Sequence, residues 1–184
     1  MTTKAFRPPV REAIIDAAID TLARNPGASL SEIAARAGVG RASLHRHFSS
    51  RGDLVTAITR QCMDEIDAAT DEAVAEARTA RGRLSRMLEA VIPLGDRYHF
   101  LGAEAFDDAG LRARHDADIE WLGGLVDELK AEGVMAPDVP RGWAVANIDA
   151  QVWLAWSQIA AGNLAPADAA GLAFRTLLRG LGQR

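Results

Sequence analysis

Two short helical segments joined by a glycine turn, near the start of this 184-residue chain, constrain its fold more than any other feature. Ser29 and Glu32 have the spacing of a capping box, in which two residues satisfy each other's backbone N–H groups, so they predict a helix over residues 30–37. Gly38 suits the left-handed conformation that ends a helix, and a second helix is predicted over residues 41–48. Two short helices around such a turn are typical of a helix-turn-helix unit.

The apolar residues of this segment predict how its helices pack. Ala34 is small where the two helices must cross closely. Val39, Leu44 and Phe48 are placed to bury apolar groups against the helices that precede them. The outer side of the second helix then carries basic and hydroxyl groups and no acid: Arg41, Ala42, Ser43, His45, Arg46 and His47. A helix that enters the negatively charged major groove of DNA needs such a surface.

The charge of the chain is divided between a basic beginning and an acidic remainder. The whole sequence has a formal net charge of −4, which alone argues against a nucleic-acid partner. Residues 1–52, however, hold eight Lys and Arg against four Asp and Glu, and the remaining residues hold 13 against 21. This asymmetry indicates a polyanionic partner for the first part only.

Almost every other ordered stretch also has the apolar spacing of a helix. Strand formers are scarce, with one Tyr in the chain, and no Asn-Gly or Asp-Gly hairpin signal occurs. Ser50 and Asp53 have the spacing that caps a long helix. Together with the two short helices, the expected helices cover residues 10–24, 53–78, 83–92, 96–106, 110–132, 141–161 and 166–180.

The segment LSEIAARAGVGRASLHRHFSSRGDL resembles the signature of the tetracycline-repressor (TetR) family of transcriptional regulators. The resemblance is strong over about residues 10–60, and elsewhere it lies in the number and length of the helices. It implies an all-α, nine-helix, two-domain architecture. Residues 1–9 would form a flexible basic arm, 10–52 the helix-turn-helix domain and 53–184 the ligand-binding and dimerisation domain, with the helix over 53–78 connecting the two.

The resemblance also implies roles for individual residues of the second short helix. Arg41 and Ala42 open this helix, where side chains of the family reach base edges. Ser43 and His47 stand where a hydroxyl and a histidine hold phosphates, and His45 stands where the family usually has tyrosine.

Three further residues are candidates for contacts with DNA. Arg51 replaces a usual lysine and keeps a cation near the DNA backbone, and Ser31 is an additional groove contact in the first turn of its helix. Arg46 is either a phosphate contact or a solvated surface charge.

The last two expected helices each have a seam of small side chains, which allows another helix to approach closely. We expect a two-fold homodimer formed mainly by these helices, as the resemblance also implies. The alternative is that both seams pack inside one chain. The seam residues are Ala146, Ala150, Trp153, Ser157, Ala169, Ala173, Thr176 and Gly180.

A pocket for a small molecule is expected among residues 83–132 and the helix over 141–161. Its candidate lining residues are Met87, Tyr98, Phe100, Phe106, Trp121 and Trp153, with Asn147, Gln151 and Gln158 as polar groups that orient a ligand. For each of these residues, packing in the core is the alternative role.

Neither a metal centre nor an active site is expected. The acids and histidines at His99, Glu104, Asp107, Asp108, His115 and Asp116 lack the close spacing of metal ligands. The chain has neither a Gly-x-Ser-x-Gly elbow nor a His-Glu-x-x-His motif, so we expect no enzyme and no cofactor. One cysteine, no apolar run of about 18 residues and no secretory signal at the N-terminus lead us to expect a cytoplasmic protein.

Taken with the resemblance, these features imply a ligand-responsive DNA-binding transcriptional regulator. We expect a repressor that binds a palindromic operator as a dimer and is released by a small-molecule effector. The alternative is a helical small-molecule-binding or interaction protein that does not bind an operator.

Overall fold

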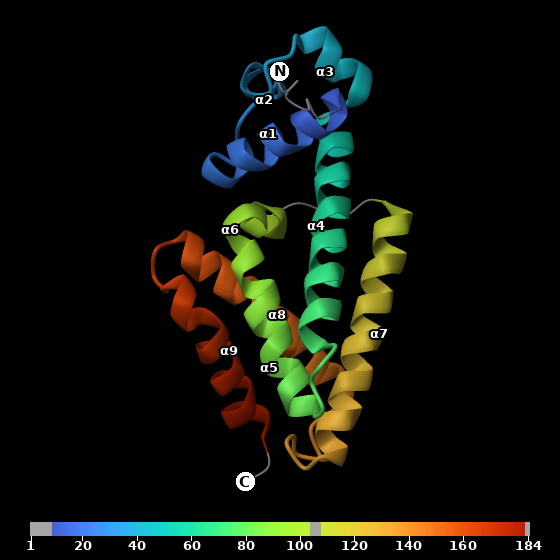
Figure 1. Cartoon of the computed structure of the whole chain (residues 1–184), viewed down its shortest axis with the longest axis vertical. Helices are drawn as coiled ribbons and strands as arrows, with labels where there is room; N and C mark the ends of the chain where they lie inside the picture. Colours follow the sequence, from blue (N-terminus) through green and yellow to red (C-terminus); the bar gives the residue numbers. More distant parts are fainter. Residues whose placement is uncertain (1–8, 104–107, 183–184) are drawn as a thin grey trace, which may run out of the picture. The chain divides into compact units, whose positions relative to one another are not determined.

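The structure is a computed structural model that describes residues 9–103 and 108–182. All its regular elements are helices over these residues, and the one isolated β-bridge among them joins Met135 and Gly182 (Figure 1). The chain divides into two compact units, Met1–Arg60 and Gln61–Arg184. This division falls inside a helix and not at residue 52, the boundary expected from the sequence. No described helix is long and apolar enough to cross a membrane.

The first unit contains three helices and the beginning of a fourth. These are α1 (Val10–Arg24), α2 (Leu30–Arg36), α3 (Arg41–His47) and α4 (Arg51–Val74). The apolar side chains that recur every four residues along α1 make one face, on which Ile14, Ala18 and Leu22 are fully buried.

The turn between α2 and α3 has the predicted geometry. The Ser29–Glu32 capping box is present, with the Ser29 N–H donating to Glu32 Oε2 at 2.7 Å and the Glu32 N–H donating to Ser29 Oγ at 3.3 Å. Gly38 has a φ of +67°, which L side chains rarely adopt. Ala34 and Leu44 are both 1% exposed, and α2 and α3 pack against each other.

The second unit is built from the remainder of α4 and from helices further along the chain. Its core includes the buried Leu84, Leu88, Val126, Ile148 and Trp156. Its further elements are α5 (Ala80–Val91), η1 (Ile92–Leu94), α6 (Gly95–Tyr98), η2 (His99–Ala103), α7 (Ala109–Ala131), α8 (Arg141–Ala160) and α9 (Pro166–Leu181). In this core α5 packs on α7 and α9, and α8 packs on α6, α7 and α9.

The bounds of α4 and α5 differ from the expected ones. Ser50 is the cap that the sequence predicts, with the Asp53 N–H donating to its Oγ at 3.0 Å, and the helix begins directly after it. The end of α4 lies at Val74 and not at residue 78. Thr79 forms an N-cap, because its Oγ1 accepts the Gly82 N–H at 3.1 Å, and α5 therefore begins three residues earlier than expected.

The prediction of one continuous helix over residues 96–106 is wrong for the residues that the structure describes. Among the described residues this segment is the single turn α6 between two 3-10 turns, η1 and η2, so eight helices of seven or more residues stand where nine are expected. The backbone at Gly95 lies so close to Trp156 that a Cβ there would overlap the indole ring. We attribute the irregular backbone to this close packing.

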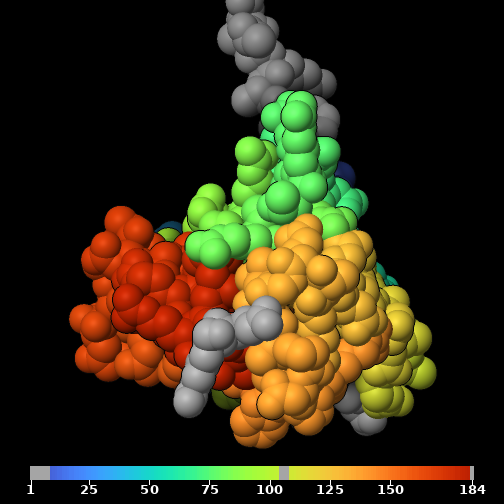
Figure 2. Space-filling model, turned by 90° about the horizontal axis from the view of Figure 1, so that it is seen from below, coloured from blue at the N-terminus to red at the C-terminus, as the bar shows by residue number. Residues whose placement is uncertain are grey.

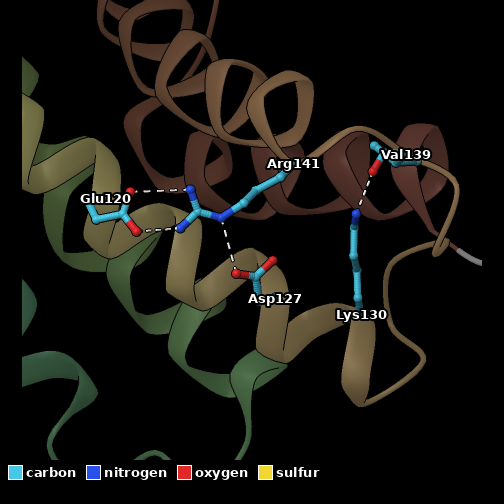
Figure 3. A network of polar contacts seen from close by, with 5 residues as sticks. All are labelled: Glu120, Asp127, Lys130, Val139 and Arg141. Carbon is cyan, nitrogen blue, oxygen red and sulfur yellow. Dashed lines mark hydrogen bonds and ion pairs between the residues drawn. The ribbon is translucent and has the colours of Figure 1, made fainter.

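Polar contacts join α7 to the start of α8 (Figure 3). Arg141 donates to Glu120 at 2.8 Å and to Asp127 at 3.1 Å. Its guanidinium lies over Gly123, where a Cβ would meet it. The Lys130 ammonium group donates to the backbone carbonyl of Val139, in the connection between the two helices.

Figure 2 shows this end of the unit from below, with the connection between α7 and α8 beside the end of α9. A second set of contacts joins these segments to the start of α5. The Glu132 carboxylate accepts the backbone N–H groups of Ala80 at 2.7 Å and Arg81 at 3.3 Å, so the end of α7 caps the start of α5. The Ala136 N–H donates to the Leu181 carbonyl at 3.0 Å, which fastens the end of α9 beside the α7–α8 connection.

Candidate nucleic-acid interface

The outer surface of α3 carries the side chains that the sequence assigns to contacts with DNA. Arg41, Ala42, His45, Arg46 and His47 are exposed, and Ser43 is half-buried. Leu44, on the opposite side, is 1% exposed and anchors the helix to its unit. All six predicted residues of α3 are therefore at least partly accessible from outside, and their individual contacts stay predictions.

The electrostatic character of this helix is uniformly basic. Among the described residues, α3 has no acid, and its last turn holds His45, Arg46 and His47. The acid of α2, Glu32, is held as a cap. Hydrogen bonds from Ser29 lower the pKa of this carboxyl, so its charge is fixed at the N-terminus of α2. Ser31, the candidate contact in α2, is half-buried beside this cap.

Arg51 has a structural role that sequence reasoning missed. Its two terminal nitrogens donate to backbone carbonyls, Nη1 to Ala28 at 2.9 Å and Nη2 to Pro26 at 2.7 Å. The first residue of α4 thus holds the turn that precedes α2. No sequence signal announces such a contact, because every residue carries a carbonyl.

A second arginine supports α3 from α1. The Arg11 guanidinium lies over the ring of Phe48 at 5.3 Å from its centroid, and Phe48 is 3% exposed. This cation–π contact covers the residue that directly follows α3. The end of α3 is also tied to α4, since the Asp53 carboxylate accepts the Ser49 N–H at 3.1 Å. Hydrogen bonds from Ser49 and Ser50 lower the pKa of Asp53.

The residues predicted to line a pocket have different surroundings in the second unit. Met87, Tyr98 and Phe100 are buried in the core, at 5% exposed or less, whereas Trp121 is 42% exposed on α7. Trp153 is half-buried and contacts Trp156 edge to face, with ring centroids 4.8 Å apart. The structure therefore does not bring Trp121 into the environment of the other rings.

The polar members of that set are on α8. Asn147 and Gln151 are both half-buried, and the Asn147 amide donates to the Trp143 carbonyl at 2.8 Å. Gln158 is also half-buried and accepts a hydrogen bond from Asn163 at 3.1 Å. Phe106 lies outside the described residues.

Two half-buried carboxylates of the second unit were not singled out from the sequence. Burial raises the pKa of Asp118 on α7 and of Asp149 on α8. Arg114 and then His115 partly offset the shift of Asp118, and His115 partly offsets that of Asp149. Asp67 on α4 raises the pKa of Asp118 further. A lone Asp within a helical pattern gives no sign of burial, so the sequence could not have separated these two from solvated acids.

A third group of buried polar side chains lies between α4 and α6. Tyr98 is fully buried, and its hydroxyl lies near Glu65 without a hydrogen bond of good geometry. Burial raises the pKa of Tyr98, and it raises the pKa of Cys62 to about 12. Arg97 donates to Glu65 at 2.8 Å and holds this carboxylate from the α6 side.

The predicted dimer seam of α8 lies at the surface. Ala146, Ala150 and Ser157 are exposed and Trp153 is half-buried. Larger apolar side chains share the exposed part of this helix, with Trp143 at 62% and Leu154 at 50% exposed. These exposed side chains leave α8 available for the predicted dimer contact, which stays a prediction.

The predicted seam of α9 needs a correction. Thr176 and Gly180 are exposed, but Ala169 and Ala173 are at most 3% exposed and pack inside their own chain. The physical reason is that small side chains let α9 approach its neighbours closely within one chain. Leu172, 43% exposed, is instead the apolar residue that α9 presents outward.

The histidines and acids near residue 100 have separate partners. His99 Nδ1 lies 3.0 Å from the Gly95 carbonyl, and the Asp108 side chain caps α7 by accepting the Leu111 N–H at 2.9 Å. Glu104 and Asp107 lie outside the described residues. Within the described ranges, no group of three His, Cys, Asp or Glu residues is arranged to hold a metal ion.

Comparison with known proteins assigns the first unit to a family. Residues 14–58 match the model of bacterial regulatory proteins of the tetR family. A relative, the HTH-type transcriptional repressor LfrR of Mycolicibacterium smegmatis, is 36% identical over 136 residues, which is 73% of this chain and 70% of LfrR.

Solved structures share the fold over nearly the whole chain. LfrR from Mycobacterium smegmatis in complex with proflavine has a TM-score of 0.76 at 29% identity, covering 95% of this chain and 97% of that one. AibR in complex with isovaleryl coenzyme A and operator DNA has a TM-score of 0.77 at 18% identity, covering 92% and 98%. At that identity, AibR shows likeness of fold alone.

Proposed function

Because the chain belongs to the tetR family of bacterial regulatory proteins, we propose that it is a ligand-responsive transcriptional repressor that binds operator DNA as a homodimer. The observation that carries this proposal is the surface of α3. Its exposed side chains are basic, polar or small, and it has no acid within the part of the chain that the structure describes.

The proposed reading of DNA follows from this surface. Arg41 and Ala42, at the start of α3, reach base edges in the major groove, where an arginine pairs with guanine. Ser43 and His47 contact phosphates, which fix the register of the helix on the duplex. The capped α2 and the buried Leu44 hold this helix rigidly, as a reading element requires.

The proposed dimer is formed by α8 and α9. A recognition helix of seven residues is only about 10 Å long and reads few base pairs. A two-fold dimer presents two such helices, about 34–36 Å apart or a multiple of that, and so selects a palindrome. The exposed Trp143, Leu154 and Leu172 supply the apolar surface that a second copy would bury.

The second unit would hold the effector. Asp118 and Asp149 are half-buried, and burial disfavours the ionised form of both carboxylates. A ligand that contacts these carboxylates would replace the water that burial removes from them. A coupling of about 1–3 kcal/mol between this ligand and the operator changes affinity about 5- to 150-fold. LfrR has been solved with proflavine, so proflavine is the first effector to test.

Selection of bound fragments from fragmented bacterial genomic DNA tests the proposed function. The purified chain should recover duplexes that share a palindrome, and its affinity for them should fall steeply with salt because bound phosphates release counterions. Recovery of no duplex above background, by a folded chain, would support the alternative of a helical binding protein without an operator.

The effector is tested on the recovered duplex. Proflavine titrated into the protein should quench the tryptophan fluorescence, to which the half-buried Trp153 contributes, and lower the affinity for the duplex. Because proflavine itself binds DNA, its effect on the duplex is compared with a DNA-binding protein of unrelated fold. Quenching without any change in operator affinity would separate ligand binding from regulation.

A further inference from the structure

We propose that Arg51 is a positioning residue of the DNA-reading unit and not a ligand of DNA phosphate. The two hydrogen bonds of its guanidinium, to the carbonyls of Pro26 and Ala28, are called here the Arg51 clamp. This inference rests on the proposed function, since it concerns how the same α3 surface is presented to the operator.

The clamp joins the two ends of the helix-turn-helix. Ala28 precedes Ser29, the N-cap of α2, and residues 48–50 connect the end of α3 to Arg51. Residues 29–50 are therefore a segment whose two ends one side chain holds together. That segment contains α2, the Gly38 turn and α3. The orientation of the exposed surface of α3 therefore depends on the contact between Arg51 and the turn that precedes α2.

The turn that the clamp grips is ordered by its own contacts. The Asn25 side chain accepts the Gly27 N–H at 3.2 Å, and the Ala28 N–H donates to the Asn25 carbonyl at 3.0 Å. Ala28 is 1% exposed, and the residue after it, Ser29, is the N-cap of α2. Because Ala28 is directly before this N-cap, the bond from Arg51 to the Ala28 carbonyl also positions the first turn of α2.

The chemistry of the clamp requires an arginine. A guanidinium presents several N–H donors in a rigid fork, so it bonds two carbonyls at fixed positions. Hydrogen bonds from a charged donor are stronger than neutral ones. Lysine offers a single ammonium on a flexible stem, so it keeps the charge at this position but does not reproduce the two bonds.

A phosphate ligand and a positioning residue predict opposite results for two variants. Arg51→Lys keeps the charge and loses the fork, whereas Arg51→Gln loses both. We expect both variants to bind the selected duplex about tenfold more weakly than the wild type, the loss that hydrogen bonds to a charged group imply. The slope of log affinity against log salt should stay that of the wild type.

The two competing roles give other outcomes. If Arg51 contacts phosphate, Arg51→Lys restores the affinity and Arg51→Gln lowers the salt slope by about one, which would overturn the proposal. If the clamp serves only stability, both variants melt at lower temperature but bind the duplex like the wild type when folded, which overturns it as well. Arg86→Gln, an exposed arginine on α5, is the matched control.

A measurement without DNA separates this inference from the proposed function. Hydrogen exchange of the backbone N–H groups in α2 should quicken in Arg51→Lys, while exchange in α5 stays unchanged. Unaltered exchange in α2 would overturn the clamp as a positioning contact, whatever the DNA result. A wild-type chain that binds no selected duplex would instead overturn the proposed function, and the exchange comparison would still decide whether the clamp holds α2.

Discussion

Gly95 lies directly against the indole of Trp156, at a distance that leaves no room for a Cβ. Trp156 is 1% exposed, and its Nε1–H donates to the Val91 carbonyl at 3.3 Å. Burial and this hydrogen bond together hold the indole in its position. This contact fixes how α6 passes over α8.

Gly95→Ala should destabilise the second unit by about 1–3 kcal/mol, the usual cost of overpacking a filled core. Thermal unfolding followed by circular dichroism measures this loss. Gly123→Ala is the matched control, because the group over Gly123 is the mobile end of Arg141. Displacing the end of Arg141 breaks exposed ion pairs, which contribute little stability. Alanine also has a higher helix propensity than glycine, so we expect only a small change in melting temperature. Equal melting temperatures for both variants would contradict the expected role of the Gly95–Trp156 contact.

Replacement of Arg41 and His47 by Ala should weaken binding to the selected duplex. Arg41→Ala removes the proposed base contact, which should cost about 1–3 kcal/mol and relax specificity at one position of each half-site. His47→Ala removes the proposed phosphate contact and should weaken binding to all sequences alike. Fluorescence anisotropy with matched and mismatched duplexes measures both effects. Arg86→Ala in α5 should bind like the wild type, and an equal affinity for the α3 variants would mean that α3 does not read the operator.

Leu154→Arg should convert the proposed dimer to a monomer. Leu154 is 50% exposed on α8, so the monomer tolerates a charge at this position. In the proposed dimer the same charge would be buried with no opposite charge to pair with. Analytical ultracentrifugation at micromolar concentration gives the mass, and circular dichroism shows whether the variant remains folded. Ala35→Arg, an exposed position on α2, should leave the mass unchanged. A wild-type chain that is itself a monomer at this concentration would refute the dimer.

Asp149→Asn should stabilise the protein at pH 7. Burial raises the pKa of Asp149 above its ordinary 3.8, with His115 opposing the shift, so the folded chain binds this proton more readily than the unfolded one. The unfolding free energy therefore falls as pH rises from the ordinary value through the raised one. The asparagine variant removes that loss.

Melting curves between pH 4 and pH 8 measure this effect. For a chain of this size, 1 kcal/mol corresponds to about 2–4 °C in Tm. The gain in Tm should be largest at neutral pH and should shrink in acid, whereas Asp16→Asn, at an exposed site on α1, should change little. A lower Tm for Asp149→Asn at pH 7 would show that the ionised carboxylate is stabilising.

The first unit was the more predictable one because its signals are local. The capping box of Ser29 and Glu32 and the positive φ of Gly38 each act within a few residues, so the sequence alone locates both helices and the exposed surface of α3. The Arg51 clamp joins residues more than twenty positions apart through backbone carbonyls, which carry no sequence signature.

The second unit depends more on contacts between distant segments. Ala169 and Ala173 show the difficulty, because a seam of small residues suits a neighbour in the same chain as well as one in a second copy. The 3-10 turns around α6 were missed for a similar reason. The backbone there follows the indole of Trp156, a residue about sixty positions further along the chain.

The sequestered Cys62 makes this protein convenient for spectroscopy. It is the one cysteine of the sequence, it is 4% exposed, and its high pKa leaves almost no thiolate at neutral pH to react with maleimides. A cysteine introduced on the surface can therefore be tagged with a dye in the otherwise native chain. Distances between two such dyes, one on each copy of the proposed dimer, would then follow the spacing of the two α3 helices as proflavine is added.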